Sequence, residues 1–67
     1  MDRFEYKMLW YKGHGLLQAD WFDGDENLGS EIDEAILNQY GAHGWEVCAY
    51  IQLMGTVQLM LKRRLAA

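Results

Sequence analysis

An acidic stretch in the middle of the chain carries the side chains best suited to hold a cation. Four oxygen-bearing residues occupy the first, third, fifth and twelfth positions of a calcium-loop pattern: Asp23, Asp25, Asn27 and Glu34. The sixth position, where such a loop needs glycine for its sharp turn, is Leu28, and no helix precedes the stretch. We therefore expect a solvated acidic loop here rather than a calcium site.

Ligand types for zinc and the members of a nucleophilic site are also present, namely His14, His43, Glu46 and Cys48. No pair has the Cys-x-x-Cys or His-x-x-x-His spacing that marks a zinc site. Cys48 with His43 would supply a nucleophile and a base, but no oxyanion-binding loop or third orienting group accompanies them. The sequence predicts no catalytic residue, no metal and no cofactor.

Aromatic residues gather before and inside the stretch 13–29. Rigid rings with a polar edge can form a wall for a stacked ligand such as a nucleotide, with a basic side chain near its phosphate. The simpler interpretation is that Trp10 and Trp21 close an open end of a small core. The hypothesis of a ligand wall rests on six residues: Trp10, Tyr11, His14, Trp21, Phe22 and Arg64.

Alternating side chains predict the first strands that would position these groups. Over residues 4–11 one side of the chain is apolar throughout, which is typical of a strand; it holds Phe4, Tyr6, Met8 and Trp10. The glycines around His14 interrupt this strand. The segment 16–22 is a candidate for a second, shorter strand, and 23–27 is interpreted as a polar loop.

A single helix is predicted to follow the acidic stretch. It begins near Ser30, whose hydroxyl can cap free N–H groups in a Ser-x-x-Asp box with Asp33. Apolar residues then recur at helical spacing. Gly44 is expected to end the helix in a left-handed conformation, and Gly41 to allow a close approach of the helix to the sheet.

After the helix, the spacing between apolar residues changes from three or four residues to two. One face is predicted to hold Trp45, Val47, Ala49, Ile51 and Leu53, followed after a turn at Gly55-Thr56 by Val57, Leu59 and Leu61. The chain is therefore one α+β domain over 1–67. We expect a small antiparallel sheet of three strands, with the 16–22 segment as an optional fourth, and one helix packed on one face in the order β-(β)-α-β-β.

The sheet face away from the helix is expected to be half apolar and to exceed what one helix can cover. Such patches on small proteins mark interfaces, so a symmetric homo-oligomer, dimeric or larger, is predicted. The residues expected at that interface are Leu9, Tyr11, Cys48, Tyr50 and Met60.

Composition narrows the classes of partner and the compartment. The 67 residues are 51% hydrophobic, and their net charge of −4 argues against general nucleic-acid binding, which needs a positive surface. One cysteine suits a reducing cytosol, and no segment resembles a signal peptide or a membrane span. A cytoplasmic protein without nucleic-acid or membrane partners is expected.

Three segments together resemble a known family. They are Phe4-Glu5-Tyr6-Lys7, the run Gly41-Ala42-His43-Gly44-Trp45-Glu46-Val47, and Leu61-Lys62-Arg63. This pattern is similar to the bacterial and phage group filed as domain of unknown function 4177. The resemblance implies a small α+β fold, a phage or bacterial accessory protein, and residues 13–29 as a loop or hairpin insertion. It implies no activity and no catalytic residue.

The sequence thus favours a non-enzymatic, homo-oligomeric binding domain that holds a small ligand or a protein partner at a subunit interface. Two alternatives stay open. One is a small enzyme with a cleft between subunits and His14 or His43 as the general base. The other is a purely structural subunit.

Overall fold

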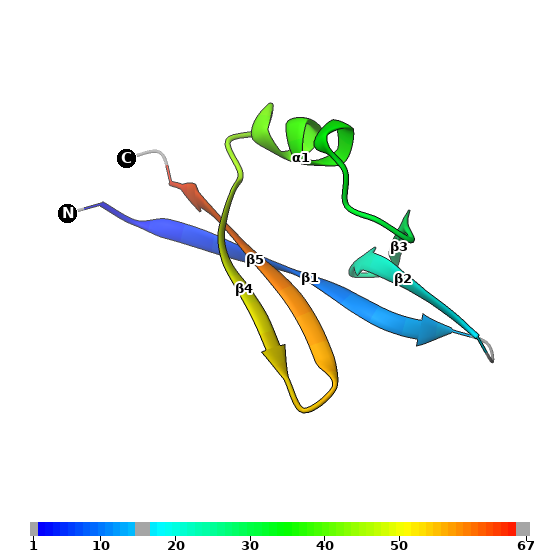
Figure 1. The fold of residues 1–67 in the computed structure, drawn as a ribbon. Helices are drawn as coiled ribbons and strands as arrows, with labels where there is room; N and C mark the ends of the chain where they lie inside the picture. The colour runs from blue at the N-terminus through cyan, green and yellow to red at the C-terminus, as the bar shows by residue number, and fades with distance from the viewer. Residues whose placement is uncertain (1, 15–16, 66–67) are drawn as a thin grey trace.

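The protein forms one five-stranded antiparallel sheet with a single short helix (Figure 1). The computed structural model describes residues 2–14 and 17–65, apart from the side chain of His14. The strands are β1 (Phe4–His14), β2 (Gln18–Asp23), β3 (Glu26–Gly29), β4 (Glu46–Leu53) and β5 (Thr56–Arg64), and the helix is α1 (Glu34–Gly41). Their order in the sheet is β3-β2-β1-β5-β4. The fold is a small α+β domain.

The predicted strand number and order are wrong. The sequence analysis expected three or four strands in the order β-(β)-α-β-β, whereas the chain runs β-β-β-α-β-β. The strand that was missed is β3, which pairs with β2 beyond a tight turn at Gly24, where φ is 61°. It has four residues and begins with Glu26 and Asn27, so its composition is that of a polar loop.

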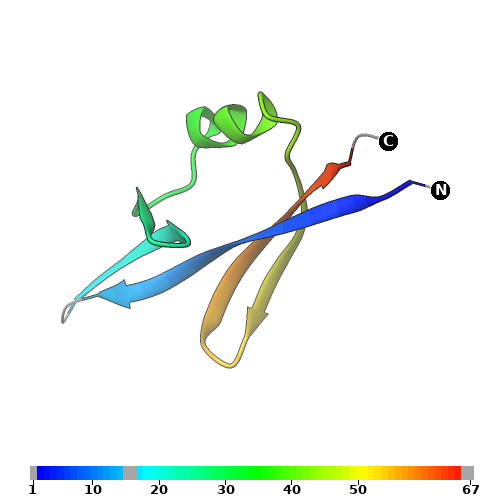
Figure 2. The same cartoon turned by 180° about the vertical axis from the view of Figure 1, so that it is seen from behind.

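The long strand β1 lies at the centre and defines two faces of the sheet. In its pairing with β2, Trp10 lies opposite Phe22. In its pairing with β5, Leu9 lies opposite Leu59. Residues opposite each other in an antiparallel pair point to the same side. Helix α1 lies on one side, here called the helix face, and no described segment of the chain covers the other, the open face (Figures 1 and 2).

The face assignment of β1 is the reverse of the one expected. The helix face of β1 holds Glu5, Lys7, Leu9 and Tyr11, with Val57, Leu59, Leu61 and Arg63 of β5 beside them. The open face holds Phe4, Tyr6, Met8 and Trp10, with Gln58, Met60, Lys62 and Arg64. Alternation shows that a strand has two unlike sides but does not say which side the helix covers.

A bulge in β4 redistributes its side chains between the two faces. The register with β5 shifts between Val47 and Ala49, so Cys48 is the additional residue. Val47 and Tyr50 consequently lie on the helix face, and Ala49 and Ile51 on the open face. The predicted face of β4 is therefore wrong beyond Val47, because one extra residue inverts every later side chain.

The start of α1 was also predicted incorrectly, and its end correctly. The N-cap is Asp33 and not Ser30: the Asp33 backbone is extended, and its carboxylate accepts a hydrogen bond from Ile36 N at 3.0 Å. At the other end Gly44 has φ 88°. Trp45 N donates to Tyr40 O at 3.1 Å and Gly44 N to Gly41 O at 2.9 Å, the pair of bonds of a Schellman motif.

The core of the described chain is very small. Leu9 and Leu61 are the buried hydrophobic residues, 0% and 1% exposed, and no residue of α1 is buried. The exposed area is 5253 Å², against about 4400 Å² for a compact monomer of this mass. The radius of gyration is 13.1 Å, against about 11 Å for a compact domain of this length. Much apolar surface is therefore left uncovered.

The two glycines around the helix end should respond to alanine in opposite ways. A Cβ at Gly44 would lie 3.2 Å from Arg63 Cδ in a left-handed conformation, whereas nothing lies within 4 Å of one at Gly41, so the predicted close approach there is wrong. We expect Gly44→Ala to lower the free energy of unfolding by about 1–2 kcal/mol. Gly41→Ala should raise it by about 0.5–1 kcal/mol. Urea denaturation of both variants measures this; equal effects would contradict the assignment.

Candidate functional site

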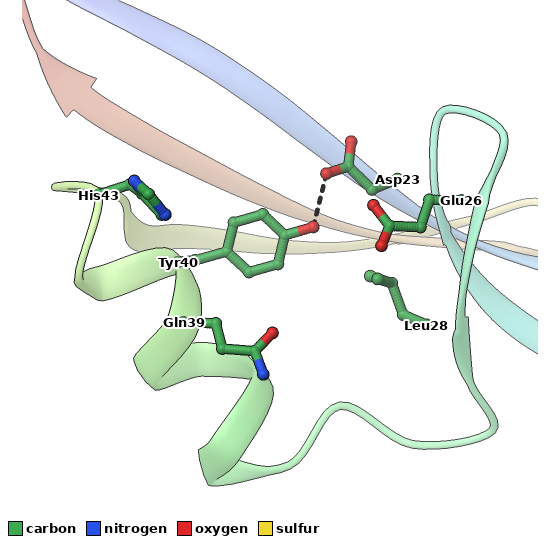
Figure 3. A pocket seen from close by; sticks show the side chains of 6 residues that line it. All are labelled: Asp23, Glu26, Leu28, Gln39, Tyr40 and His43. Atoms are coloured by element: carbon green, nitrogen blue, oxygen red, sulfur yellow. Dashed lines mark hydrogen bonds between the residues drawn. The ribbon is translucent and has the colours of Figure 1, made fainter.

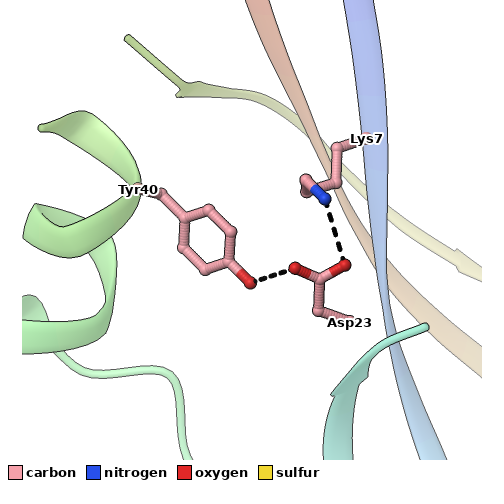
Figure 4. Close-up of polar contacts among 3 residues, drawn as sticks. All are labelled: Lys7, Asp23 and Tyr40. Atoms are coloured by element: carbon pink, nitrogen blue, oxygen red, sulfur yellow. Dashed lines mark hydrogen bonds and ion pairs between the residues drawn. The ribbon is translucent and has the colours of Figure 1, made fainter. Parts of the chain in front are cut away.

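Three side chains from separate elements join the helix to the sheet, and we call them the interlayer cluster: Lys7, Asp23 and Tyr40 (Figure 4). Lys7 Nζ lies 3.2 Å from Asp23 Oδ1. The Tyr40 hydroxyl donates to the other carboxylate oxygen, Asp23 Oδ2, at 2.5 Å. Asp23 therefore uses both oxygens, one toward the central strand and one toward the helix.

The strand register explains why these side chains meet. Trp10 pairs with Phe22, so Asp23, the next residue of β2, comes beside Leu9 on the helix face. Lys7 lies two residues along β1 on that same face. Tyr40 belongs to the last turn of α1 and extends from the helix toward the sheet (Figure 4).

The interlayer cluster changes the acidity of the Tyr40 phenol. Burial, which disfavours the charged phenolate, is the largest cause that raises the Tyr40 pKa. The hydrogen bond to Asp23 and the negative charges of Asp23 and Glu26 raise this pKa further. Tyr40 is therefore a neutral hydrogen-bond donor throughout the physiological range of pH.

A second set of contacts holds the exit of the helix. The indole ring of Trp45 has Arg63 Cζ 4.4 Å from its centroid and Lys7 Nζ 5.4 Å from it. Arg63 also donates to the His43 carbonyl at 3.2 Å and forms an ion pair with Glu5. One arginine on β5 thus binds the turn after α1, the tryptophan beyond it and the central strand.

A pocket of about 200 Å³ lies between α1 and the β2–β3 turn (Figure 3). The helix and its exit contribute Gln39, Tyr40 and His43, and the strands contribute Asp23, Glu26 and Leu28. The stretch 23–34 carries six acidic residues and no basic one, so the potential around this pocket is negative: Asp23, Asp25, Glu26, Glu31, Asp33 and Glu34. The groups that line it are mainly hydrogen-bond acceptors.

The pocket contains His43 but not Cys48, so it does not bring together the nucleophile and base considered from the sequence. Cys48 is exposed at the β4 bulge and does not line the pocket. His43 does line it, and no hydrogen bond of its imidazole is seen in the described parts of the chain. Two carboxylates, a phenol oxygen and an amide oxygen beside Leu28 suit a cation with a short apolar portion.

The structure does not bring the predicted aromatic wall together. The rings of Tyr11 and Trp21 lie on the helix face with centroids 5.2 Å apart. Trp10 and Phe22 form a register pair on the opposite, open face. Arg64 pairs with Phe4, six residues along β1 from Trp10 and therefore about 20 Å away. The His14 side chain lies outside the described residues.

The residues predicted for a subunit interface are also divided between places. Leu9 is fully buried inside the chain and cannot contact another copy, which corrects its assignment. Tyr11 and Tyr50 lie on the helix face, Met60 lies on the open face, and Cys48 is at the bulge. The five residues form no common surface.

The calcium-loop pattern does not become a metal site. Asp23 is occupied by Lys7 and Tyr40, while Asn27 donates from Nδ2 to Asp20 and accepts from Gly29 N. Among the described residues no group of three histidine, cysteine or acidic side chains could hold a metal ion. Two of the four residues in the pattern, Asp23 and Asn27, therefore already use their side-chain oxygens within the protein.

Sequence reasoning missed most of the pocket. The sequence patterns assign no role at this site to Tyr40, Lys7, Glu26, Leu28 or Gln39. The available signal was the run of acidic residues at 23–34, beside a helix whose core-facing side contains a phenol. A strand pairing was needed to bring Lys7 beside Asp23.

Comparison of the chain with models of protein families, with curated proteins and with solved structures finds no match. The resemblance to domain of unknown function 4177 therefore stays a prediction. Within the described residues, no helix has the length and apolar character needed to cross a membrane.

The contribution of the Tyr40 hydroxyl to the free energy of unfolding should decrease at high pH. Near neutral pH we expect Tyr40→Phe to lower the free energy of unfolding by about 1.5 kcal/mol, since a hydrogen bond to a charged group is lost. The folded-state pKa is raised above the unfolded value of about 10, so this contribution is complete below pH 10 and decreases above it.

Urea denaturation of both proteins from pH 7 to pH 11.5 measures the difference between them. The difference should be constant up to about pH 10 and then shrink. The difference between the two proteins isolates the contribution of the Tyr40 hydroxyl. A difference that grows above pH 10 would contradict the hydrogen bond.

Proposed function

We propose that the chain is a non-enzymatic, homo-oligomeric binding domain whose pocket between α1 and the β2–β3 turn takes a small organic cation. The observation that carries this proposal is the pocket lined by Asp23 and Glu26, which belong to a stretch, 23–34, that contains six acidic residues and no basic one. The sequence favours a ligand site at a subunit interface, whereas the site proposed here lies within a single chain. A cytosolic location remains part of it, because the chain has one cysteine.

The charges around the pocket favour an ammonium or guanidinium group. Lys7 neutralises Asp23, but no ion pair to Glu26 is seen in the part of the chain that the structure describes. Glu26 is therefore the carboxylate that a ligand cation would meet, and the charged hydrogen bond would be the strongest contact available. The Gln39 amide and the Tyr40 oxygen can accept further hydrogen bonds.

The volume sets the size of the ligand. A pocket of about 200 Å³ is smaller than the ~300–1,000 Å³ typical of sites for drug-sized ligands. It suits a short alkyl chain against Leu28 with one cationic head and is too small for a nucleotide. The same group occurs as a free amine or as the lysine side chain of a partner protein, so the shared chemistry is an alkylammonium.

The histidine at the pocket keeps a small enzyme as the second candidate. His43 lines the same space as two carboxylates and could act as a general base. His43→Ala separates the two functions, since it should leave the affinity for a cation held by Glu26 nearly unchanged. Loss of a catalysed reaction in this variant would instead support the enzyme.

Binding of an alkylammonium should depend on Glu26. We expect butylamine to bind to the wild-type chain and Glu26→Gln to weaken it about tenfold, since a charged hydrogen bond contributes about 1.5 kcal/mol. Glu31→Gln makes the same chemical change at an exposed acid outside the pocket and should have little effect. NMR titration of backbone amides gives both the affinity and the location.

Two further titrations test the ligand class and its source. Butyrate has the same alkyl chain with the opposite charge and should not bind. A short lysine peptide that binds much more tightly than butylamine would identify a protein partner as the source. Equal binding of butylamine and butyrate, or no chemical-shift change at Gln39 and Tyr40, would contradict the proposed site.

A further inference from the structure

The open face of the sheet carries exposed apolar side chains that no described part of the chain covers, among them Phe4, Tyr6, Trp10 and Leu53. On the central strand β1 every open-face position from Phe4 to Trp10 is apolar or aromatic, whereas the helix face of that strand begins with Glu5 and Lys7. Neighbouring strands add Phe22 of β2, Met60 of β5, and Ala49, Ile51 and Leu53 of β4, with Gln58 of β5 between Trp10 and Ile51. The aromatic row of β1 thus faces away from α1.

From this arrangement we infer that two copies of the chain pack through their open faces, as a sandwich of two sheets. The inference rests on the homo-oligomeric part of the proposed function and supplies its surface. Sheets with apolar faces pack against each other about 10 Å apart, with interdigitated side chains forming a core. The core that a single chain lacks would lie between the two copies.

The area that the monomer leaves exposed matches what a stable dimer needs. The exposed area of 5253 Å² is about 850 Å² larger than expected for a compact monomer of this mass. A specific interface of ordinary size buries about 800 Å² on each partner. Packing of one open face against another would therefore lower the exposed area of each chain to about the value usual for a protein of its size.

The charges of the open face allow a second copy to approach. The whole chain carries −4, but the excess of acid is in 23–34, away from this face. Three basic and three acidic residues border the apolar row: Asp2, Lys12, Asp20, Glu46, Lys62 and Arg64. Lys62 pairs with Glu46 at 3.6 Å, and Arg64 with Asp2 at 2.7 Å. The border is neutral, so two such faces do not repel.

The residues that border the apolar row of the open face also resemble the polar rim of a protein interface. Lys62 Nζ lies 4.9 Å from the ring centroid of Phe4, and Lys12 Nζ lies 5.5 Å from that of Phe22. These cations cover the edges of the apolar row, while Tyr6 at its middle is 60% exposed. A polar rim around an aromatic and methionine-rich centre is the usual composition of a protein interface.

Tyrosines of equal exposure on opposite faces provide the test. Tyr6 is 60% exposed on the open face and Tyr50 is 61% exposed on the helix face, so neither substitution disturbs the core of one chain. Sedimentation velocity of the full chain should give a dimer for the wild type and for Tyr50→Glu. Tyr6→Glu places a charge in the interface and should weaken dimerisation at least about a hundredfold. Leu53→Glu, 65% exposed on another strand of the open face, should act likewise.

Methionine oxidation gives a readout that needs no substitution. Met8 and Met60 lie on the open face, whereas Met54 in the β4–β5 turn is 95% exposed. With dilute peroxide, Met54 should oxidise quickly, and Met8 and Met60 should become protected as the protein concentration rises through the dimer range. Mass spectrometry of peptides measures all three in one sample.

The sedimentation and oxidation results distinguish an open-face dimer from another oligomer and from a monomer. If the wild type is an oligomer that Tyr6→Glu and Leu53→Glu leave intact, with Met8 and Met60 unprotected, the open-face dimer is wrong while a homo-oligomer stands. If Tyr50→Glu alone dissociates the oligomer, the interface is on the helix face. A wild-type monomer at 100 µM overturns both the dimer and the oligomeric part of the proposed function. Butylamine titration tests the pocket separately.

Discussion

The stacking of the Arg63 guanidinium on Trp45 is the contact on which the placement of the helix depends. The helix buries no residue, so apolar packing alone does not fix its position. Arg63 binds the indole ring, the His43 carbonyl and Glu5 at once, and Tyr40 reaches Asp23 from the preceding turn. These contacts connect the helix and its exit to β2 and β5, and through Glu5 to β1. The helix is thereby held at a distance that leaves the pocket between it and the β2–β3 turn (Figure 3).

This way of holding the helix explains why the faces of the sheet are unlike. The charged residues Glu5, Lys7 and Arg63 lie beneath the helix because they anchor it, and the aromatic row of β1 is consequently left on the open face. A domain of this length buries only about 60% of its unfolded surface even when compact. Placing ion pairs under the helix reduces the apolar core further, and this is the reason for proposing that a second chain supplies additional burial.

Local signals predicted the parts of the fold that depend on neighbouring residues. The alternation of β1, the left-handed Gly44 and the apolar helix face of β5 with Leu61 follow from spacing within a few residues. The bulge at Cys48 and the pairing of β3 depend on the partner strand, and neither leaves a mark in its own segment. The pocket was missed for the same reason. Lys7, Asp23 and Tyr40 are brought together by register and by the helix position, which sequence spacing does not contain.

The two proposed surfaces lie on opposite sides of one sheet, and this arrangement decides how they can influence each other. A dimer formed through the open faces leaves both pockets outward, each beside its own acidic stretch, so ligand access would not require dissociation. Coupling between the sites would have to pass through the sheet, where Lys7 on the helix face is next in sequence to Tyr6 and Met8 on the open face. A ligand that competed with Lys7 for Asp23 would act on the central strand directly. If the pocket and the dimer are both as proposed, the two sites should act independently, and cooperative binding would place the coupling at β1.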